Sequence, residues 1–216
     1  MRNLAITLII SLTVVSAVSP SIAAEPSRTI QVVVDNSGTF QNVKNAIVQE
    51  KTLFWRLVEL RKRSGFRNVI INVVSINNPR NLFVGTSHQL WKNGSDLIPK
   101  LAVIPNGCAD LVAAFEQVKA NIEMNRATRA DIYVFSSLIN TNTPCQNITV
   151  NLPQKPPENL DLSFLKDTGS KLTFFWVHSL QVREWHPYLQ KAGLDHVRLY
   201  DEEGTKRILR ERLADE

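Results

Sequence analysis

The sequence predicts an α/β protein with a mostly parallel six-stranded sheet covered by helices on both faces. Apolar, β-branched runs alternate with segments of helical periodicity almost from end to end. Such alternation is typical of a parallel sheet with helices on both faces. The first strand-like run ends in "DNSGT" and the fourth in "FSS". Polar groups therefore follow two strands at the edge of the sheet where ligands of α/β proteins bind.

Residues 1–24 are predicted to form a signal peptide. Arg2 precedes an apolar run of about 15 residues, shorter than the roughly 20 that span a bilayer. Ala23 and Ala24 supply the small residues of a cleavage site. We therefore expect residues 25–216 to form one domain, exported to a periplasm or secreted, with no insertion into a membrane.

The charge balance argues against a nucleic-acid partner. Without Arg2, the 25 basic residues fall to 24, against 20 acidic residues. The densest basic run, residues 56–67, closes a predicted helix, where positive charge complements the helix dipole. A nucleic-acid interface would need a longer basic face with interleaved aromatic residues.

The first half of the domain predicts three strands and one long helix. A buried strand spans residues 30–35, a second lies within 66–76, and a short edge strand at 81–85 follows the turn at 77–80. Residues 95–104 read as a short helix or a loop broken by Pro99. The helix is predicted over residues 40–62, and its expected buried face comprises Phe40, Val43, Ile47, Phe54, Leu57 and Val58.

The second half predicts the rest of the sheet. A helix starts near Ala109, with Leu111, Phe115, Val118 and Ile122 on one face. Strands are expected at residues 130–137, 171–177 and 196–201, and helices at 159–165, 180–193 and 202–213. The polar span from 140 to 158 is long for a loop, which indicates that it is either functional or fixed by contacts to the rest of the domain.

The stretch from residue 30 to 39 resembles the opening of a von Willebrand factor A-type (vWA) domain, an apolar strand followed by Asp-x-Ser-x-Ser/Thr. Asp35, Ser37 and Thr39 fill the three places. The resemblance covers roughly residues 29–214 and implies the strand order 3-2-1-4-5-6. It also implies a metal-ion-dependent adhesion site, in which these residues hold Mg²⁺ or Mn²⁺ and a protein partner presents a carboxylate to the ion.

Two positions depart from the vWA pattern. Ala109 stands where the family has a later Thr, and Ser137 stands where it has a second Asp. With one carboxylate instead of two, we expect weak cation binding. The resemblance thus implies a non-catalytic protein-binding module with a degenerate site, whose rim includes Ser136 and Ser137. The alternative is structural: Ser37 or Thr39 caps the following helix, and Asp35 accepts bonds from loop amides.

A haloacid-dehalogenase-like phosphatase is the competing hypothesis, because "VVVDNSGTF" also resembles the opening of that family. The resemblance would make Asp35 the nucleophile in a sheet of order 5-4-1-2-3. Ser37 occupies the place of the general acid, a role that serine cannot fill near neutral pH. The further catalytic positions would be Ser136, Lys166 or Lys171, and the acidic pair Asp201 and Glu202.

The two cysteines, Cys108 and Cys145, predict one disulfide if the protein is exported. Two buried free thiols are the alternative. The vWA resemblance implies that the segments carrying both cysteines rise at the carboxyl edge of the sheet, so we expect a Cys108–Cys145 bond at the rim of the site.

Overall fold

The computed structural model describes residues 27–40, 44–141, 150–166, 170–194 and 196–210. The predicted signal peptide, residues 1–24, lies outside this part of the chain. Among the described residues, none of the helices combines the length and the apolar character that crossing a membrane requires.

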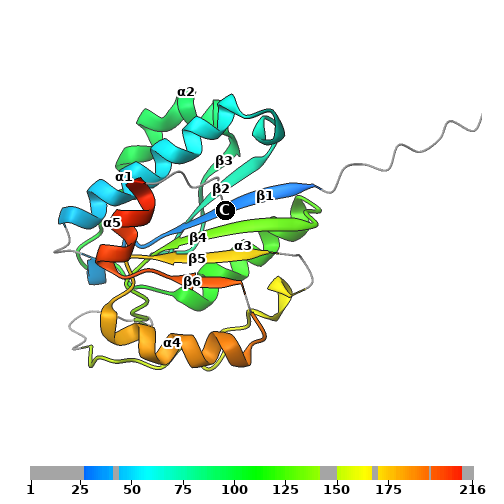
Figure 1. Cartoon of the computed structure of the whole chain (residues 1–216). Coiled ribbons are helices and arrows are strands. Elements are labelled where there is room, and N and C mark those ends of the chain that lie inside the picture. The colour runs from blue at the N-terminus through cyan, green and yellow to red at the C-terminus, as the bar shows by residue number, and fades with distance from the viewer. Residues whose placement is uncertain (1–26, 41–43, 142–149, 167–169, 195, 211–216) are drawn as a thin grey trace, which may run out of the picture.

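The fold is a single six-stranded sheet with the order β3-β2-β1-β4-β5-β6 (Figure 1). All neighbours pair in parallel except β2 and β3, which form an antiparallel pair at one edge. This confirms the predicted α/β class and strand order. The strands are β1 (Arg28–Val34), β2 (Ile70–Ser75), β3 (Asn81–Thr86), β4 (Arg129–Phe135), β5 (Lys171–Phe175) and β6 (Val197–Leu199).

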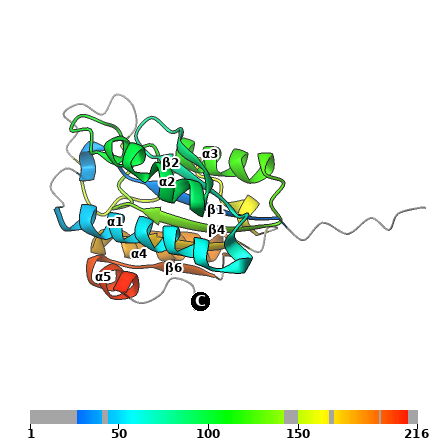
Figure 2. The same cartoon turned by 90° about the horizontal axis from the view of Figure 1, so that it is seen from above.

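Helices cover both faces of the sheet (Figure 2). On one face, α1 (Lys44–Glu59), α2 (Ser87–Leu97) and α5 (Glu202–Arg210) share a core with Val32 and Val34 of β1. On the other face, α3 (Leu111–Met124) and α4 (Ser179–Lys191) share a core with Val33. Because β1 is buried on both sides, its sequence is continuously apolar rather than alternating.

Short 3-10 turns connect several of these elements. They are η1 (Gly38–Phe40), η2 (Leu60–Lys62), η3 (Ser64–Phe66), η4 (Ile98–Leu101) and η5 (Ser163–Leu165). The helix predicted over residues 40–62 is therefore α1 with a 3-10 turn on either side of it. The helix predicted over residues 159–165 is only the turn η5.

The structure also differs from the sequence-based expectations at α2 and within α1. Helix α2 was not predicted, although Thr86 and Gln89 form a capping box at its start, with mutual side-chain to backbone hydrogen bonds. In α1, Ile47 is 40% exposed rather than buried. Phe40, Leu57 and Val58 are buried as expected, and Val43 lies outside the described residues. The further inward positions of the helix are Ala46, Glu50 and Leu53, because a buried acid interrupts the apolar stripe that the periodicity predicts.

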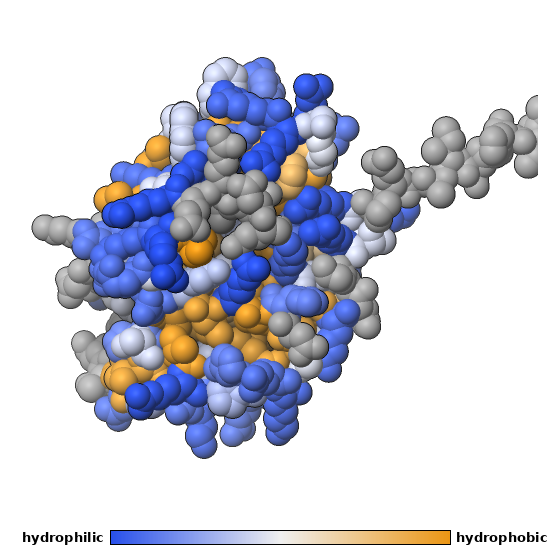
Figure 3. Space-filling view, in the orientation of Figure 1, coloured by the Kyte–Doolittle hydropathy of each residue, from blue (hydrophilic) through white to orange (hydrophobic). Residues whose placement is uncertain are grey.

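At the other edge of the sheet, β6 has only three residues and pairs with β5 alone in the described sheet. Figure 3 shows apolar surface gathered between α4 and the strand layer on this side. The half-buried side chains packed against the core here include Val182, Leu194, Val197 and Leu199. So short an edge strand gives other chains little to pair with, which limits edge-to-edge association.

Candidate functional site

Asp35 lies at the centre of the carboxyl edge of the sheet. It directly follows β1, and its N–H donates to the carbonyl of Phe135, the last residue of β4, at 2.9 Å. The chain leaves β1 for β2 on one side, and β4 lies on the other, so the strand order reverses between β1 and β4. This is the position where α/β sheets bind ligands.

Three hydroxyls converge on the Asp35 carboxylate. Its Oδ1 accepts from Ser37 Oγ at 2.6 Å and from the Ser37 N–H at 3.1 Å. Its Oδ2 accepts from Ser136 Oγ at 2.8 Å and from Thr39 Oγ1 at 3.5 Å. Ser37 Oγ and Thr39 Oγ1 are 2.7 Å apart. The predicted residues Asp35, Ser37, Thr39 and Ser136 therefore form one oxygen cluster.

The cluster is almost closed to solvent. Asp35 is 3% exposed, and Ser37 and Ser136 are fully buried. Burial raises the pKa of the Asp35 carboxyl, and the hydrogen bonds from Ser37, Ser136 and Thr39 act against that rise. A carboxylate in this setting gains from a positive charge placed beside it, since a cation offsets the cost of removing it from water.

The segment 104–107 packs on top of the Asp35 loop. The Ile104 N–H donates to the Asn36 carbonyl at 2.9 Å, and the Gly38 N–H donates to the Gly107 carbonyl at 2.9 Å. The Asn36 side chain accepts from Ser75 Oγ at 2.7 Å. The loops after β1 and β2 and the segment before α3 are thus tied together around the site.

Gly38 is required by this close approach, because a Cβ at this position would lie 2.3 Å from the backbone oxygen of Pro105. Gly38→Ala is expected to lower the free energy of unfolding by about 2 kcal/mol, as overpacking against backbone does. Urea denaturation measures the change. Gly94→Ala is the matched control: its Cβ meets nothing within 4 Å, so it should be neutral or stabilise α2 by up to about 1 kcal/mol. Equal stability of Gly38→Ala and the wild type would contradict this packing.

Ser137 and Ala109 do not join the oxygen cluster. The Ser137 carbonyl accepts from the His178 N–H at 3.3 Å, and its buried hydroxyl has no hydrogen-bond partner in the described structure. Ala109 is fully buried. It is paired with Thr141, whose N–H donates to the Ala109 carbonyl and whose Oγ1 accepts from the Ala109 N–H, both at 2.7 Å.

This pairing fixes the segment before α3 against the loop after β4. A further bond joins them, from the Leu111 N–H to Asn140 Oδ1 at 2.9 Å. Cys108 directly precedes the paired Ala109, and Cys145 follows Thr141 by four positions. Cys145 lies outside the described residues, so the disulfide stays a prediction.

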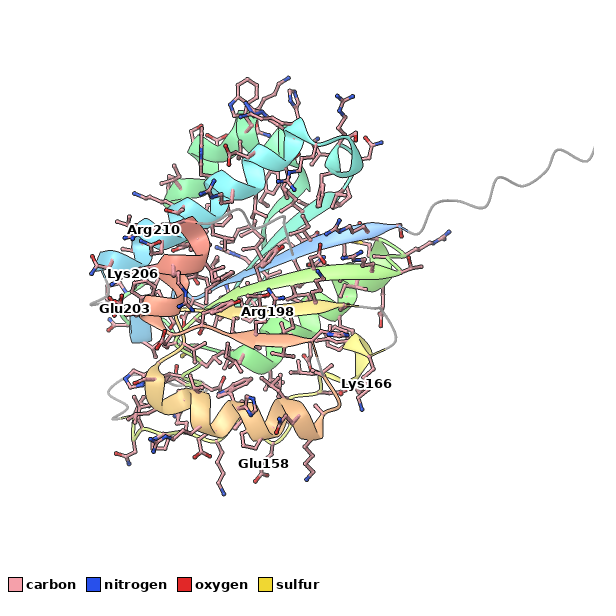
Figure 4. The ribbon with its side chains drawn as sticks, in the orientation of Figure 1. Glu158, Lys166, Arg198, Glu203, Lys206 and Arg210 are labelled. Carbon is pink, nitrogen blue, oxygen red and sulfur yellow. The ribbon has the colours of Figure 1, made fainter. Side chains whose placement is uncertain are left out.

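The residues that the phosphatase hypothesis adds to Asp35 and Ser136 do not gather there. Lys171 begins β5 and pairs in register with Asp131, whereas Asp35 follows Val34, which pairs with Phe135 at the far end of β4. Lys166 lines a cavity of about 580 Å³ together with Lys171, and Figure 4 shows it at the opposite end of the sheet from Lys206. Both lysines thus lie toward the amino edge.

The proposed acidic pair has other contacts. Asp201 Oδ1 accepts from the Gly204 N–H at 2.8 Å, and Glu202 pairs with Lys206 at 2.7 Å. Both therefore stabilise the start of α5. Strand order does not separate the two hypotheses, because 5-4-1-2-3 has the same neighbours when read from the other edge. The two hypotheses are distinguished instead by the positions of the two lysines and the acidic pair, and by Ser37 in the place of the general acid.

Glu50 is a residue near this site that the sequence analysis did not identify. It lies on the inward face of α1 and is 6% exposed. Its Oε1 is buried with no hydrogen-bond partner among the described residues. Burial, and then the charge of Asp35, raise the pKa of Glu50 to about 8. The sequence signal that could have identified Glu50 is an acidic residue at helical spacing between the apolar residues Ala46 and Leu53.

A hard cation would suit the oxygen cluster. In the part of the chain that the structure describes, no three His, Cys, Asp or Glu side chains gather as a metal-binding group. Binding would therefore depend on the Asp35 carboxylate with the hydroxyls of Ser37 and Thr39. Carboxylate and other oxygen ligands are those that Mg²⁺ takes in proteins.

No family model and no curated protein matches the sequence. Solved structures do match over most of the chain. The VWA domain of SpRpn10 aligns at a TM-score of 0.52 and 14% identity, with 81% of this chain and 87% of that domain covered. The pilus adhesin SpaC of Lactobacillus rhamnosus GG aligns at 0.57 and 12% identity, with 89% and 30% covered.

A third match is proximal thread matrix protein 1 of the mussel byssus, in a structure with a zinc-occupied MIDAS motif. It aligns at a TM-score of 0.51 and 13% identity, with 85% of this chain and 46% of that chain covered. This chain spans less than two thirds of the length of such matched pilus and byssus proteins. The comparisons show a vWA-like fold.

Proposed function

We propose that this protein is an exported, non-catalytic binding module that recognises a protein partner through a divalent cation held by Asp35, Ser37 and Thr39. The observation that carries the proposal is the convergence of three hydroxyls on one buried carboxylate at the switch point between β1 and β4. Mg²⁺ or Mn²⁺ would be bound there, and a carboxylate of the partner would complete its coordination.

The surroundings of the site support a protein partner. Ile104, whose N–H bonds to the site loop, is 48% exposed. Leu180, at the start of α4 beside the Ser137–His178 contact, is 42% exposed. Exposed apolar side chains of this kind contribute contact area when a protein partner covers them. The pilus adhesin and the pilin among the structural matches have the same fold, which is compatible with such a role.

The proposal predicts that partner capture depends on both the cation and Asp35. The mature protein, immobilised, should retain a partner from an extract of exported proteins in Mg²⁺, and release it when the cation is chelated. Asp35→Asn should lose this capture, because the neutral amide no longer attracts the cation. Asp96→Asn on exposed α2 is the matched control and should behave like the wild type. Capture that persists in Asp35→Asn or after chelation would contradict the proposal.

A second measurement tests the absence of catalysis. The mature protein with Mg²⁺ should not hydrolyse p-nitrophenyl phosphate, because Ser37 cannot act as a general acid. Turnover that Asp35→Asn abolishes would replace the binding module with a phosphatase.

A further inference from the structure

Glu50 is a buried acid whose position has no structural explanation. The residues at the other inward positions of α1 are Ala46, Leu53 and Leu57, all fully buried in the apolar core. A carboxyl group among them is costly unless its oxygens find partners. Oε1 of Glu50 is buried and has none in the described structure. An apolar side chain would pack this position at lower cost.

The placement of α1 directs Glu50 toward the oxygen cluster. The helix begins at the carboxyl edge, shortly after η1, which contains Thr39 (Figure 1). Glu50 lies six residues after Lys44, about 9 Å along the helix axis. Side chains of a helix lean toward its N-terminus, so the Glu50 carboxyl leans back toward the edge where Asp35 lies.

The charges of the two carboxyl groups also interact. The negative charge of Asp35 is the second cause, after burial, of the raised pKa of Glu50. A nearby like charge disfavours the ionisation of a carboxyl group. Among the described carboxyl groups, Asp35 and Glu50 are the two for which burial is the leading cause of a raised pKa.

We propose that Glu50 is a second carboxylate ligand of the cation site formed by Asp35, Ser37 and Thr39. In the vWA pattern a second Asp stands at the position of Ser137, after β4. Here Glu50 of α1 supplies that second negative charge. The inference rests on the proposed cation site and adds a ligand to it. Two carboxylates neutralise a divalent cation, and the cation gives the unpartnered Oε1 a partner. Mg²⁺ and Mn²⁺ fit such a set of oxygen ligands.

The test uses the full mature chain and Mn²⁺ alone. Free Mn²⁺ is measured by electron paramagnetic resonance while the ion is titrated into the wild type, Glu50→Gln, Asp35→Asn and Glu123→Gln. Glu123 of α3 is exposed and serves as the matched control. We expect Glu50→Gln to weaken Mn²⁺ binding at least tenfold, Asp35→Asn to weaken it as much or more, and Glu123→Gln to leave it unchanged.

A second measurement uses only the wild-type protein, so it does not depend on whether a variant folds. In wild-type protein carrying ¹³C-labelled glutamate, addition of Mn²⁺ should shift one glutamate carboxyl band in the infrared difference spectrum. Mn²⁺ binding that needs Asp35 but is unaffected by Glu50→Gln, with no shifted glutamate band, would overturn this inference and leave the proposed function standing. Absence of Mn²⁺ binding to the wild type would instead overturn the cation in the proposed function, and this inference with it.

Discussion

Glu50→Gln is expected to raise the free energy of unfolding at pH 7 by about 3 kcal/mol in cation-free buffer. The pKa of Glu50 is about 8 in the folded protein, against 4.5 for an ordinary glutamate. Between these values the unfolded chain gains stability by ionising, while the folded protein keeps the proton. A difference of one pKa unit corresponds to about 1.4 kcal/mol, and the gap between pH 4.5 and pH 7 gives the stated figure as an upper estimate.

The sign of the pH dependence follows from the same shift. The folded-state pKa is raised, so the stability associated with protonated Glu50 is fully present below pH 4.5. It is lost as the pH rises toward 8, by up to about 5 kcal/mol in all. Glutamine has no proton to lose, so the variant should lack this component of the decline.

Urea denaturation at intervals from pH 4 to pH 9, with a chelator present, measures both effects. The exposed Glu123→Gln serves as the control, and its stability should stay within about 0.5 kcal/mol of the wild type at each pH. A Glu50→Gln curve parallel to that of the wild type would mean that Glu50 ionises as freely in the folded protein as in the unfolded chain.

Reduction of the predicted Cys108–Cys145 disulfide is expected to lower the free energy of unfolding by about 3–4 kcal/mol in the chain-entropy model. The loop it closes spans 37 positions, from 108 to 145. The hydrogen bonds between Ala109 and Thr141 hold the residue after Cys108 against a residue four positions before Cys145, which supports a bond between the two cysteines. The melting temperature should therefore fall when a reductant is added.

Mass spectrometry of a non-reduced digest decides whether the bond exists. The double variant Cys108→Ser/Cys145→Ser is the matched control for reductant effects, and its melting temperature should not change on reduction. Two free thiols in protein prepared under oxidising conditions would contradict the predicted disulfide.

The strands could be predicted because their signals are local and strong, whereas their order was implied by the resemblance to vWA domains. The β-branched run that ends at Asp35 can be buried only in the centre of a covered sheet, and Asp35, Ser37 and Ser136 follow strands that end at the same edge. Ser137 was predicted at the rim with Ser136. Alternate residues of a strand point to opposite faces, so only one of two successive serines can reach Asp35.

Glu50 and α2 could not be identified in the same way. Periodicity assigns an apolar residue to each inward helical position, so it favoured Ile47 over the pair Ala46 and Glu50. The inward face of α1 is set by tertiary contact with the sheet, which the helix sequence alone does not contain. Helix α2 carries few apolar residues at helical spacing. Its sequence signal is the capping box formed by Thr86 and Gln89.

The pairing of β1 with β4 has a consequence for how the chain folds. Val34 lies beside Phe135, 101 positions further along the sequence. Because loop closure must precede such a contact, pairing across so long a separation is intrinsically slow. During synthesis, residues 29–34 emerge before residues 129–135 and remain unpaired on this side until those residues have followed. A six-residue segment rich in valine and isoleucine, exposed for that interval, is prone to intermolecular β-pairing. Chains cut short before β4 should aggregate through β1, and rapid completion of the sheet protects the full chain from the same fate.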